Sequence, residues 1–303
     1  MARRAACTVC LLLVLLGGCI PPPADEPADG PLKVFVGIPP LAYLAERIGG
    51  EHVAVQVLLP TGQDPHTFQL TPKQVVVLSR AQLFFKIGLP FENRLAEKLA
   101  HDPRLPQVVD VTDGIKKRRM DADCRGHGAD DHAEENEHGE EWDPHVWLSP
   151  PLLKTQAASI AAALERADPA HEKDYQTNLA HLCEDLDATS AKIAEALAPL
   201  RGQAFFVFHP ALGYFADAYG LKQEAVEAGG KSPTPRQLGA LIEKAKAQHV
   251  KIIFVQPQFD QHRAQTVAKA IGGSVVRIDP LAKDVLRNLA DIAAQIKQGL
   301  LIE

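Results

Sequence analysis

Short apolar runs, rich in β-branched and aromatic residues, recur along the chain from Lys33 onwards, and stretches with helical spacing separate them. Runs of this length bounded by turn residues are typical of buried strands. Strands that alternate with helices predict parallel sheets covered by helices. The expected strands are 33–38, 53–59, 83–88 and 108–111 in the first half, and 204–208, 223–227, 251–255 and 274–278 in the second.

The two halves also resemble each other in sequence. The segment IPPLAYLA (38–45) aligns with HPALGYFA (209–216), and TPKQV (71–75) aligns with TPRQL (234–238). In the second pair a Thr suited to cap a helix precedes a Pro suited to its first turn, so each segment opens a helix at a corresponding place. We therefore expect a duplicated pair of α/β domains, with chance similarity of generic strand–turn–helix segments as the alternative.

A stretch between the halves has the spacing of one long amphipathic helix. Asp168 can cap it, Pro169 can start it, and neither Gly nor Pro interrupts it again before Pro199. A helix of about 30 residues spans about 45 Å, enough to run the length of a two-lobed molecule and to limit hinge opening. The predicted fold class is thus α/β, with two similar domains whose parallel sheets are flanked by helices, joined by one long rigid helix. The apolar face of that helix would consist of Tyr175, Leu179, Leu182, Leu186, Ile193 and Leu197.

The first residues have the pattern of a secretory signal. Two arginines precede an apolar run that is too short to span a bilayer as a stable helix, and small residues then lead to Cys19. The sequence Leu-Gly-Gly-Cys resembles the lipobox of bacterial lipoproteins, which implies a lipidated Cys19 and a chain anchored on the periplasmic or extracellular face of a bacterial membrane. An ordinary signal near a chance cysteine is the alternative. The expected boundaries are a signal at 1–18, a proline-rich tether at 19–31, domains at 32–166 and 200–303, and the linker helix at 167–199.

Charge and composition narrow the function classes. Once Arg3 and Arg4 leave with the signal, 30 Lys and Arg of the original 32 face 38 Asp and Glu. An acidic chain argues against a nucleic-acid partner. No later apolar run is long enough to span a membrane. Cys124 and Cys183 remain in the mature chain, and a disulfide between them is permitted but undecided.

One segment has a composition that cannot form a packed core. Residues 121–141 contain nine acidic side chains, one Arg and three histidines. We expect a surface loop there, because the segment lacks apolar periodicity. Imidazoles suit zinc and many carboxylates raise the local cation concentration, so the segment is interpreted as a low-affinity collector of divalent cations. A solvated acidic loop is the alternative. The histidines in question are His127, His132 and His138.

Three other histidines stand where a strand or loop leads into a helix start. The tripeptide Asp-Pro-His occurs twice and carries His66 and His145, and His209 follows a strand and precedes a proline. In open α/β sheets ligands bind beyond the carboxyl ends of strands, where such junctions gather. Proline restricts both itself and the residue before it, so these turns would hold each imidazole in place. Singly each His is more often a turn or core residue, and it is the set of three that predicts a metal site.

A fourth candidate ligand is Asp279, which follows a strand directly and precedes Pro280. Its alternative role is a helix cap, which is common for Asp. Three neutral imidazoles and one carboxylate would close the coordination sphere of Zn²⁺ and leave no position for an activated water. The sequence also lacks the H-E-x-x-H motif of zinc proteases. We therefore expect a binding protein and no enzyme.

Taken in order, these motifs resemble the zinc- and manganese-binding substrate-binding lipoproteins of ABC importers (cluster A-I, ZnuA/TroA-like). The resemblance spans essentially the whole mature chain, and the ordered set is specific although no single piece would be. It implies two α/β domains joined by a rigid helix, with one metal in the cleft between them. The ligands would be His66, His145, His209 and Asp279. The motifs are LLPTGQDPHTFQLTP, the His-rich insertion, DPHVWLSP, FVFHPALGYFADAYGL, PTPRQL, IIFVQPQF and VVRIDPLAKD.

The same resemblance indicates the cargo and the partner. Manganese-selective relatives usually have Glu where this chain has His209, whereas zinc relatives have His there together with a His-rich loop. The chain is thus expected to be a monomer that captures Zn²⁺ and delivers it to an ABC permease in the cytoplasmic membrane. Mn²⁺ or iron is the alternative cargo, and a secreted zinc hydrolase or a surface adhesin is a further alternative.

Many zinc relatives have Glu at the position of Gln256, which leaves the role of Gln256 open. Since the histidine ligands must be neutral, affinity is expected to fall as the pH drops toward and below about 6.5.

Overall fold

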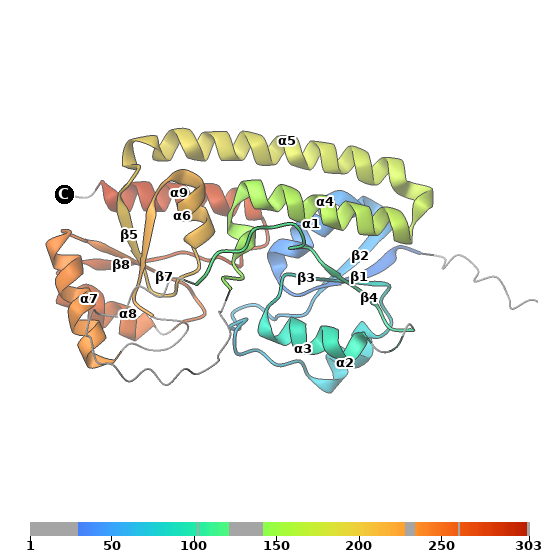
Figure 1. Ribbon diagram of the computed structural model, residues 1–303, viewed down its shortest axis with the longest axis horizontal. Helices are drawn as coiled ribbons and strands as arrows, with labels where there is room; N and C mark the ends of the chain where they lie inside the picture. The colour runs from blue at the N-terminus through green and yellow to red at the C-terminus, as the bar shows by residue number, and fades with distance from the viewer. Residues whose placement is uncertain are drawn as a thin grey trace, which may run out of the picture. The chain divides into compact units, whose positions relative to one another are not determined.

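The computed structural model describes residues 30–100, 102, 104–120, 142–227, 234–259 and 261–301. Two four-stranded parallel sheets form the centres of two lobes, as Figure 1 shows. The N-terminal lobe has the strand order β2-β1-β3-β4, and the C-terminal lobe has the order β6-β5-β7-β8. The strands are β1 (Leu32–Val36), β2 (Val53–Val57), β3 (Leu83–Lys86), β4 (Gln107–Asp110), β5 (Ala204–Val207), β6 (Lys222–Ala225), β7 (Ile252–Val255) and β8 (Ser274–Arg277).

All eight predicted strands are present, and the identical strand order in the two sheets confirms two similar α/β domains. The helix starts at Thr71-Pro72 and Thr234-Pro235 are also confirmed at corresponding places, between the second and third strand of each lobe. Both carry a full capping box, in which the Thr side chain accepts the backbone N–H of a Gln while that Gln accepts the N–H of the Thr. The sequence similarity between the halves thus marks equivalent positions in one repeated topology.

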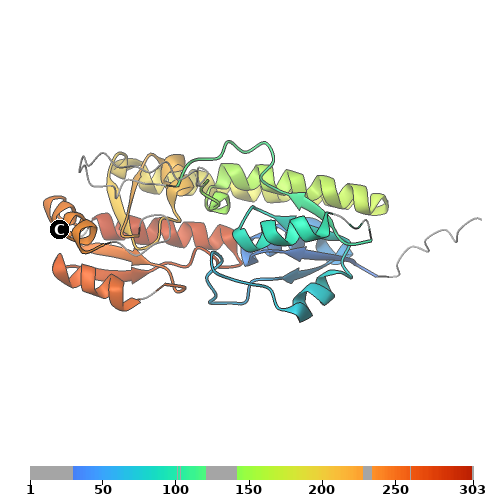
Figure 2. The same ribbon diagram turned by 60° about the horizontal axis from the view of Figure 1, so that its bottom comes forward.

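Helices cover the sheets and connect the lobes. α4 and α5 pack against each other, and α5 also packs against α1 of the N-terminal lobe and α9 of the C-terminal lobe. In Figures 1 and 2 α5 accordingly runs along both lobes. The helices are α1 (Pro39–Gly49), α2 (Pro72–Leu78), α3 (Pro90–Leu99), α4 (Pro150–Ala167), α5 (Glu172–Leu197), α6 (Gly213–Tyr219), α7 (Pro235–Ala247), α8 (Gln261–Ala270) and α9 (Val285–Leu300).

The long helix α5 has the predicted apolar face but not the predicted start. Five of the six expected positions are fully buried and Leu179 is partly buried against the same core. Pro169–His171 forms a separate 3-10 turn, so the α-helix begins at Glu172. The Asp168 carboxylate makes no cap bond there, because it accepts a hydrogen bond from the Tyr175 hydroxyl at 2.7 Å and contacts His171 Nδ1 at 2.6 Å. The helix has 26 residues and spans about 39 Å at ~1.5 Å per residue.

Two further helix starts lie near the predicted ligands. α4 begins at Pro150 after His145, and the side chain of Ser149 makes no capping hydrogen bond. Asp279 begins no helix, since α9 starts later and Asp284 accepts the backbone N–H of Arg287 as its cap. The alternative role of Asp279 as a helix cap is therefore wrong.

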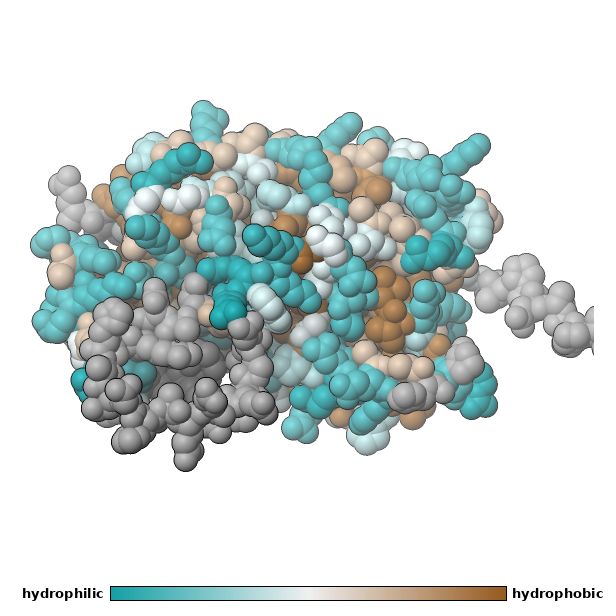
Figure 3. Space-filling model, in the orientation of Figure 1, coloured by the Kyte–Doolittle hydropathy of each residue, from teal (hydrophilic) through white to brown (hydrophobic). Residues whose placement is uncertain are grey.

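The visible surface is mainly polar. Figure 3 shows hydrophilic side chains over most of one face, with hydrophobic side chains in small groups between them. In the part of the chain that the structure describes, no helix combines the length and apolar character needed to cross a bilayer. Most of the large apolar side chains lie inside the lobes, and the largest hydrophobic cluster joins residues of both lobes.

Candidate metal centre

Three histidines from three separate segments meet between the lobes. His66 lies in the loop between β2 and α2, His145 stands directly before the 3-10 turn Val146–Leu148, and His209 follows β5. One ring nitrogen of each lies within 4.8 Å of the others. Among the residues with described coordinates, this is the one group of three or more His, Cys, Asp or Glu side chains close enough to share an ion. The structure thus brings together the three histidines that the sequence singles out.

Both Asp-Pro-His tripeptides fold into the same local turn. Asp64 Oδ1 accepts the backbone N–H of His66 at 2.9 Å, and Asp143 Oδ1 accepts that of His145 at 3.0 Å. This is the Asx-type bond, in which a carboxylate replaces a backbone carbonyl two residues earlier in the chain. The intervening proline has no N–H and a restricted φ, so it favours the turn without competing for the carboxylate. Each tripeptide therefore fixes the backbone from which an imidazole projects.

Two of the three imidazole rings are oriented by buried carboxylates. Asp143 Oδ1 lies 2.7 Å from His145 Nδ1, and Glu227 Oε2 lies 3.1 Å from His209 Nδ1. Such a partner holds the proton on Nδ1 and leaves Nε2 as the free lone pair, which is the usual arrangement around metal-ligating histidines.

The free nitrogens could serve as metal ligands. Within the described part of the chain, the Nε2 atoms of His66 and His209 are buried and have no hydrogen-bond partner. Buried polar atoms without a partner are costly, and a bound cation would satisfy both. Ligand nitrogens around a tetrahedral Zn²⁺ lie about 3.4 Å apart at bond lengths of ~2.0–2.1 Å, so nitrogens that lie up to 4.8 Å apart would have to move closer together to bind one ion. The space beside the rings measures about 10 Å³, enough for one ion.

Two residues that position His209 were not recognised from the sequence. Glu227 stands two residues after β6 and was included only in an expected strand. Gln256, whose role the family resemblance left open, is fully buried and donates from Nε2 to the His209 carbonyl at 2.7 Å. Its Oε1 accepts the His209 N–H at 3.3 Å. Both residues follow strands of the C-terminal sheet, at the same edge as His209. Their positions directly after predicted strands could therefore have indicated in the sequence that they lie near His209.

Asp279 lies near this cluster, but its carboxylate is already engaged. Its Oδ1 accepts the backbone N–H of Leu281 at 3.0 Å and the Nε2–H of Gln258 at 3.2 Å. Gln258 and Leu281 both line the small space beside the histidines. Asp279 is not part of the three-histidine group, so its role as a fourth ligand stays a prediction. Coordination by Asp279 would require the carboxylate to turn from Gln258 towards the rings.

The two lobes are joined on one side of the histidines by Arg118 and Tyr214. The Tyr214 hydroxyl accepts the Arg118 N–H at 2.9 Å and donates to the Asp143 carbonyl at 3.0 Å. The Arg118 guanidinium pairs with Asp143 at 3.3 Å and with Asp217 of α6 at 3.2 Å. A Cβ at Gly213 would stand 1.2 Å from Arg118 Nη1, so glycine is required for this close approach.

A second interlobe bond is made by Trp147. Trp147 Nε1 donates to the Pro280 carbonyl at 2.7 Å, and Trp147 also packs its ring 5.2 Å from the His145 ring. Phe259 stacks on His209 with ring centroids 4.4 Å apart. Aromatic rings therefore contact two of the three imidazoles and keep water from them.

Burial favours the neutral form of two of these imidazoles, His66 and His209. It is the main cause that lowers the pKa of His66 to about 2, and repulsion from the rings of His145 and His209 adds to it. Burial also lowers the pKa of His209, against the opposing effect of Glu227. Neutral imidazole is the form that binds a metal, so these two residues are ready for one at acidic pH as well. The expected loss of affinity near pH 6.5 therefore does not follow from these two side chains.

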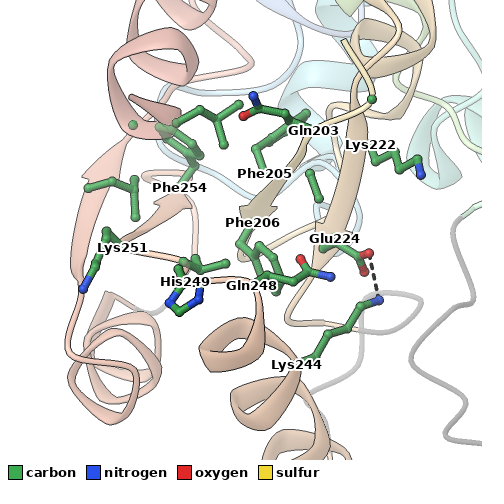
Figure 4. A pocket seen from close by; sticks show the side chains of 16 residues that line it. Gln203, Phe205, Phe206, Lys222, Glu224, Lys244, Gln248, His249, Lys251 and Phe254 are labelled. Atoms are coloured by element: carbon green, nitrogen blue, oxygen red, sulfur yellow. Dashed lines mark ion pairs between the residues drawn. The ribbon is translucent and has the colours of Figure 1, made fainter. Parts of the chain in front are cut away.

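A larger cavity of about 630 Å³ lies in the C-terminal lobe at the opposite edge of its sheet (Figure 4). Lys222, Lys244 and Lys251 line it, and Lys244 pairs with Glu224 at 2.8 Å. Lysines carry no free lone pair at neutral pH and repel cations. Its volume exceeds that of the space beside the histidines, but its lysines do not suit a cation, whereas the three-histidine group could hold one.

Several predicted sites lie outside the described residues. They are the lipidation site Cys19, the loop histidines His127, His132 and His138, and Cys124. The expected signal, tether and loop 121–141 are outside them as well.

The fold and the donor set are those of a two-lobed protein whose histidine cluster between the lobes could hold a metal ion. The chain belongs to the family described as ZnuA, zinc-uptake complex component A periplasmic, whose model matches residues 34–298. The family resemblance inferred from the motifs is thereby confirmed, and this family is one of transport components.

Individual relatives agree over most of the chain. The high-affinity zinc uptake system protein ZnuA of Yersinia pestis is 29% identical over 272 residues, covering 84% of this chain and 84% of that protein. A crystal structure of ZnuA is 36% identical with a TM-score of 0.80, covering 89% of this chain and 99% of that one. A structure of a ZnuA deletion mutant with zinc bound is 35% identical with a TM-score of 0.80, covering 90% and 99%.

The first prediction concerns Glu227. Replacing Glu227 by Gln keeps the size of the side chain but removes the charge that orients His209 Nδ1, so affinity for added Zn²⁺ should fall about 10- to 100-fold. Competition with a chromophoric chelator measures this. Glu243→Gln, on the exposed face of α7, is the matched control and should bind as the wild type does. Equal affinity in the two variants would contradict the role given to Glu227.

The second prediction concerns the metal-free protein. Because the folded-state pKa of His66 lies below its ordinary value of 6.5, the unfolded chain binds more protons below that pH. The free energy of unfolding should therefore have its full value above about pH 6.5. As the pH drops below that value, His66 should lower the free energy of unfolding by up to ~1.4 kcal/mol per pH unit. His66→Gln should reduce the slope of the free energy of unfolding against pH, between about pH 6 and pH 4.5, by about 1 kcal/mol per pH unit. Urea unfolding with chelator present tests this, and exposed His181→Gln should leave the slope unchanged.

Proposed function

We propose that this protein captures Zn²⁺ between its lobes and delivers it to a membrane permease as the binding component of an importer. The observation that carries the proposal is the cluster of three histidines, two of which have a buried Nε2 that finds no hydrogen-bond partner among the described residues. Membership of the zinc-uptake family supports it, and so does the similar structure of a ZnuA variant with zinc bound.

The donor set favours zinc over harder cations. Imidazole nitrogen suits Zn²⁺, whereas Mn²⁺ and Mg²⁺ prefer carboxylate and carbonyl oxygen. Asp279 would complete the coordination as the fourth ligand. Four protein ligands are typical of sites that hold zinc, whereas catalytic sites keep a position for water. Capture without chemistry on the cargo therefore fits the site better than hydrolysis does.

Delivery requires that the site open. Two bonds flank the histidines and cross between the lobes, one at Tyr214 and one at Trp147. The helix α5 packs on both lobes, so a wide hinge motion would disrupt its contacts. Release would thus proceed by local displacement of a ligand segment when the loaded protein meets the permease.

The proposal also covers where the protein is anchored and how Zn²⁺ reaches the cleft. A lipidated Cys19 would keep the protein, as a monomer, on the periplasmic or extracellular face of a bacterial membrane. The histidines His127, His132 and His138, with the acidic residues around them, would raise the local concentration of Zn²⁺ near the cleft.

The third prediction tests the ligand set. His66→Ala and His209→Ala should each abolish tight binding of one Zn²⁺ per chain, because each removes a donor from the buried cluster. Isothermal calorimetry of the metal-free protein measures the stoichiometry and affinity. His181→Ala, on the exposed side of α5, is the control and should bind one Zn²⁺ with unchanged affinity. Unchanged binding in both cluster variants would refute the proposed function.

The same titration decides the fourth ligand. If Asp279 coordinates zinc, Asp279→Ala should weaken binding by at least about 10-fold. X-ray absorption of the loaded wild type should then show four nitrogen or oxygen neighbours together with the outer-shell scattering of three imidazoles. Unchanged affinity in Asp279→Ala would remove Asp279 from the site and leave the three histidines.

A further inference from the structure

The short helix α2 exposes three consecutive valines. The exposed fractions of Val75, Val76 and Val77 are 37%, 56% and 38%, and only Leu78 of this helix is buried. Exposed runs of apolar residues are unfavourable unless they have a function, and valine is also a poor helix former. We call these three residues the valine face. They account for most of the large apolar side chains that are exposed in the described part of the chain.

A cavity of about 340 Å³ adjoins the valine face where α2 meets α3. Leu70, Val75, Phe91 and Leu95 provide its apolar lining, and Arg94 and Lys98 add two positive charges. Exposed apolar surface combined with a cavity is typical of interaction sites. The two cations favour a partner that presents an apolar side chain together with a carboxylate.

This surface is connected to the loop that carries His66. The Phe68 ring packs edge-on against Phe91 of α3 at 5.1 Å, and Arg94 Nη2 donates to the Phe68 carbonyl at 3.4 Å. At the start of α2, Gln74 Nε2 donates to the Leu58 carbonyl at 2.9 Å, which ties together the two ends of the loop. A partner that moves α2 or enters the cavity would therefore also move the segment next to His66.

We propose that the valine face and its adjoining cavity are the surface on which the membrane permease docks, through an apolar projection that carries an acidic residue. This inference rests on the proposed function, since it names where the delivery partner binds. Docking would displace Phe68 and, with it, His66, which weakens the zinc site at the moment of transfer. A helix of seven residues is about 10 Å long, and a stable homodimer needs about 800 Å² per subunit, so this small surface suits a transient partner better than a second copy.

The fourth prediction tests this surface with Val76→Asp. The side chain is exposed, so the purified variant should fold normally and bind Zn²⁺ within about twofold of the wild-type affinity. When the variant replaces the wild-type protein in its own bacterium under zinc limitation, the initial rate of radioactive zinc uptake should fall at least about 10-fold. Leu301→Asp is the matched control, because Leu301 is 60% exposed and lies in the other lobe. It should leave both binding and uptake unchanged.

The charge requirement is tested in the same assay. Lys98→Glu should lower uptake without changing zinc affinity, and Lys98→Arg should retain uptake. Wild-type uptake in both Val76→Asp and Lys98→Glu would overturn the docking surface, while loss of uptake in His66→Ala would still support the proposed function. Dimers of the wild type that dissociate in Val76→Asp, seen by light scattering, would identify a second copy as the occupant and also overturn the proposal.

Discussion

The buried carboxylate of Asp143 connects the metal centre to the packing of the two lobes. Its Oδ1 accepts the backbone N–H of His145 and contacts the same residue's Nδ1, while its Oδ2 pairs with Arg118. Its own carbonyl accepts the hydroxyl of Tyr214 from the other lobe. Asp143 is fully buried, and a buried charge is tolerated only when such bonds satisfy it. Loss of any partner would therefore disturb both the orientation of His145 and the interlobe contact.

The site also illustrates how a repeated fold can produce an asymmetric centre. Both lobes have the same strand order, and the edges where their strands end provide the ligand-bearing segments. Both Asp-Pro-His turns nevertheless belong to the N-terminal lobe, whereas His209 and its partners Glu227 and Gln256 belong to the C-terminal lobe. A metal held from both sides couples its binding to the relative position of the lobes, which a site within one lobe could not do.

Much of this arrangement could be predicted because it depends on local patterns. Alternating strands and helices, the two Thr-Pro helix starts and the apolar face of α5 each follow from periodicity or from the chemistry of one turn. The start of α5 was predicted less well, because the Asp168 carboxylate bonds to Tyr175 and His171 in preference to capping the helix. Competition between local bonds of similar energy is not visible in the spacing of residues.

The sequence by itself determined that His66, His145 and His209 stand on stiff turns after strands or loops, since proline and aspartate act on the neighbouring backbone whatever the rest of the chain does. Only the tertiary structure decided which ring nitrogens are free, because it places Glu227 at Nδ1 of His209 and Asp143 at Nδ1 of His145. It also decided the burial that lowers the pKa of His66. It also decided that Asp279 bonds to Gln258 and Leu281. Glu227 and Gln258 lie 18 and 21 residues from their partners, and desolvation depends on everything packed around a group, so neither effect can be seen in a local pattern.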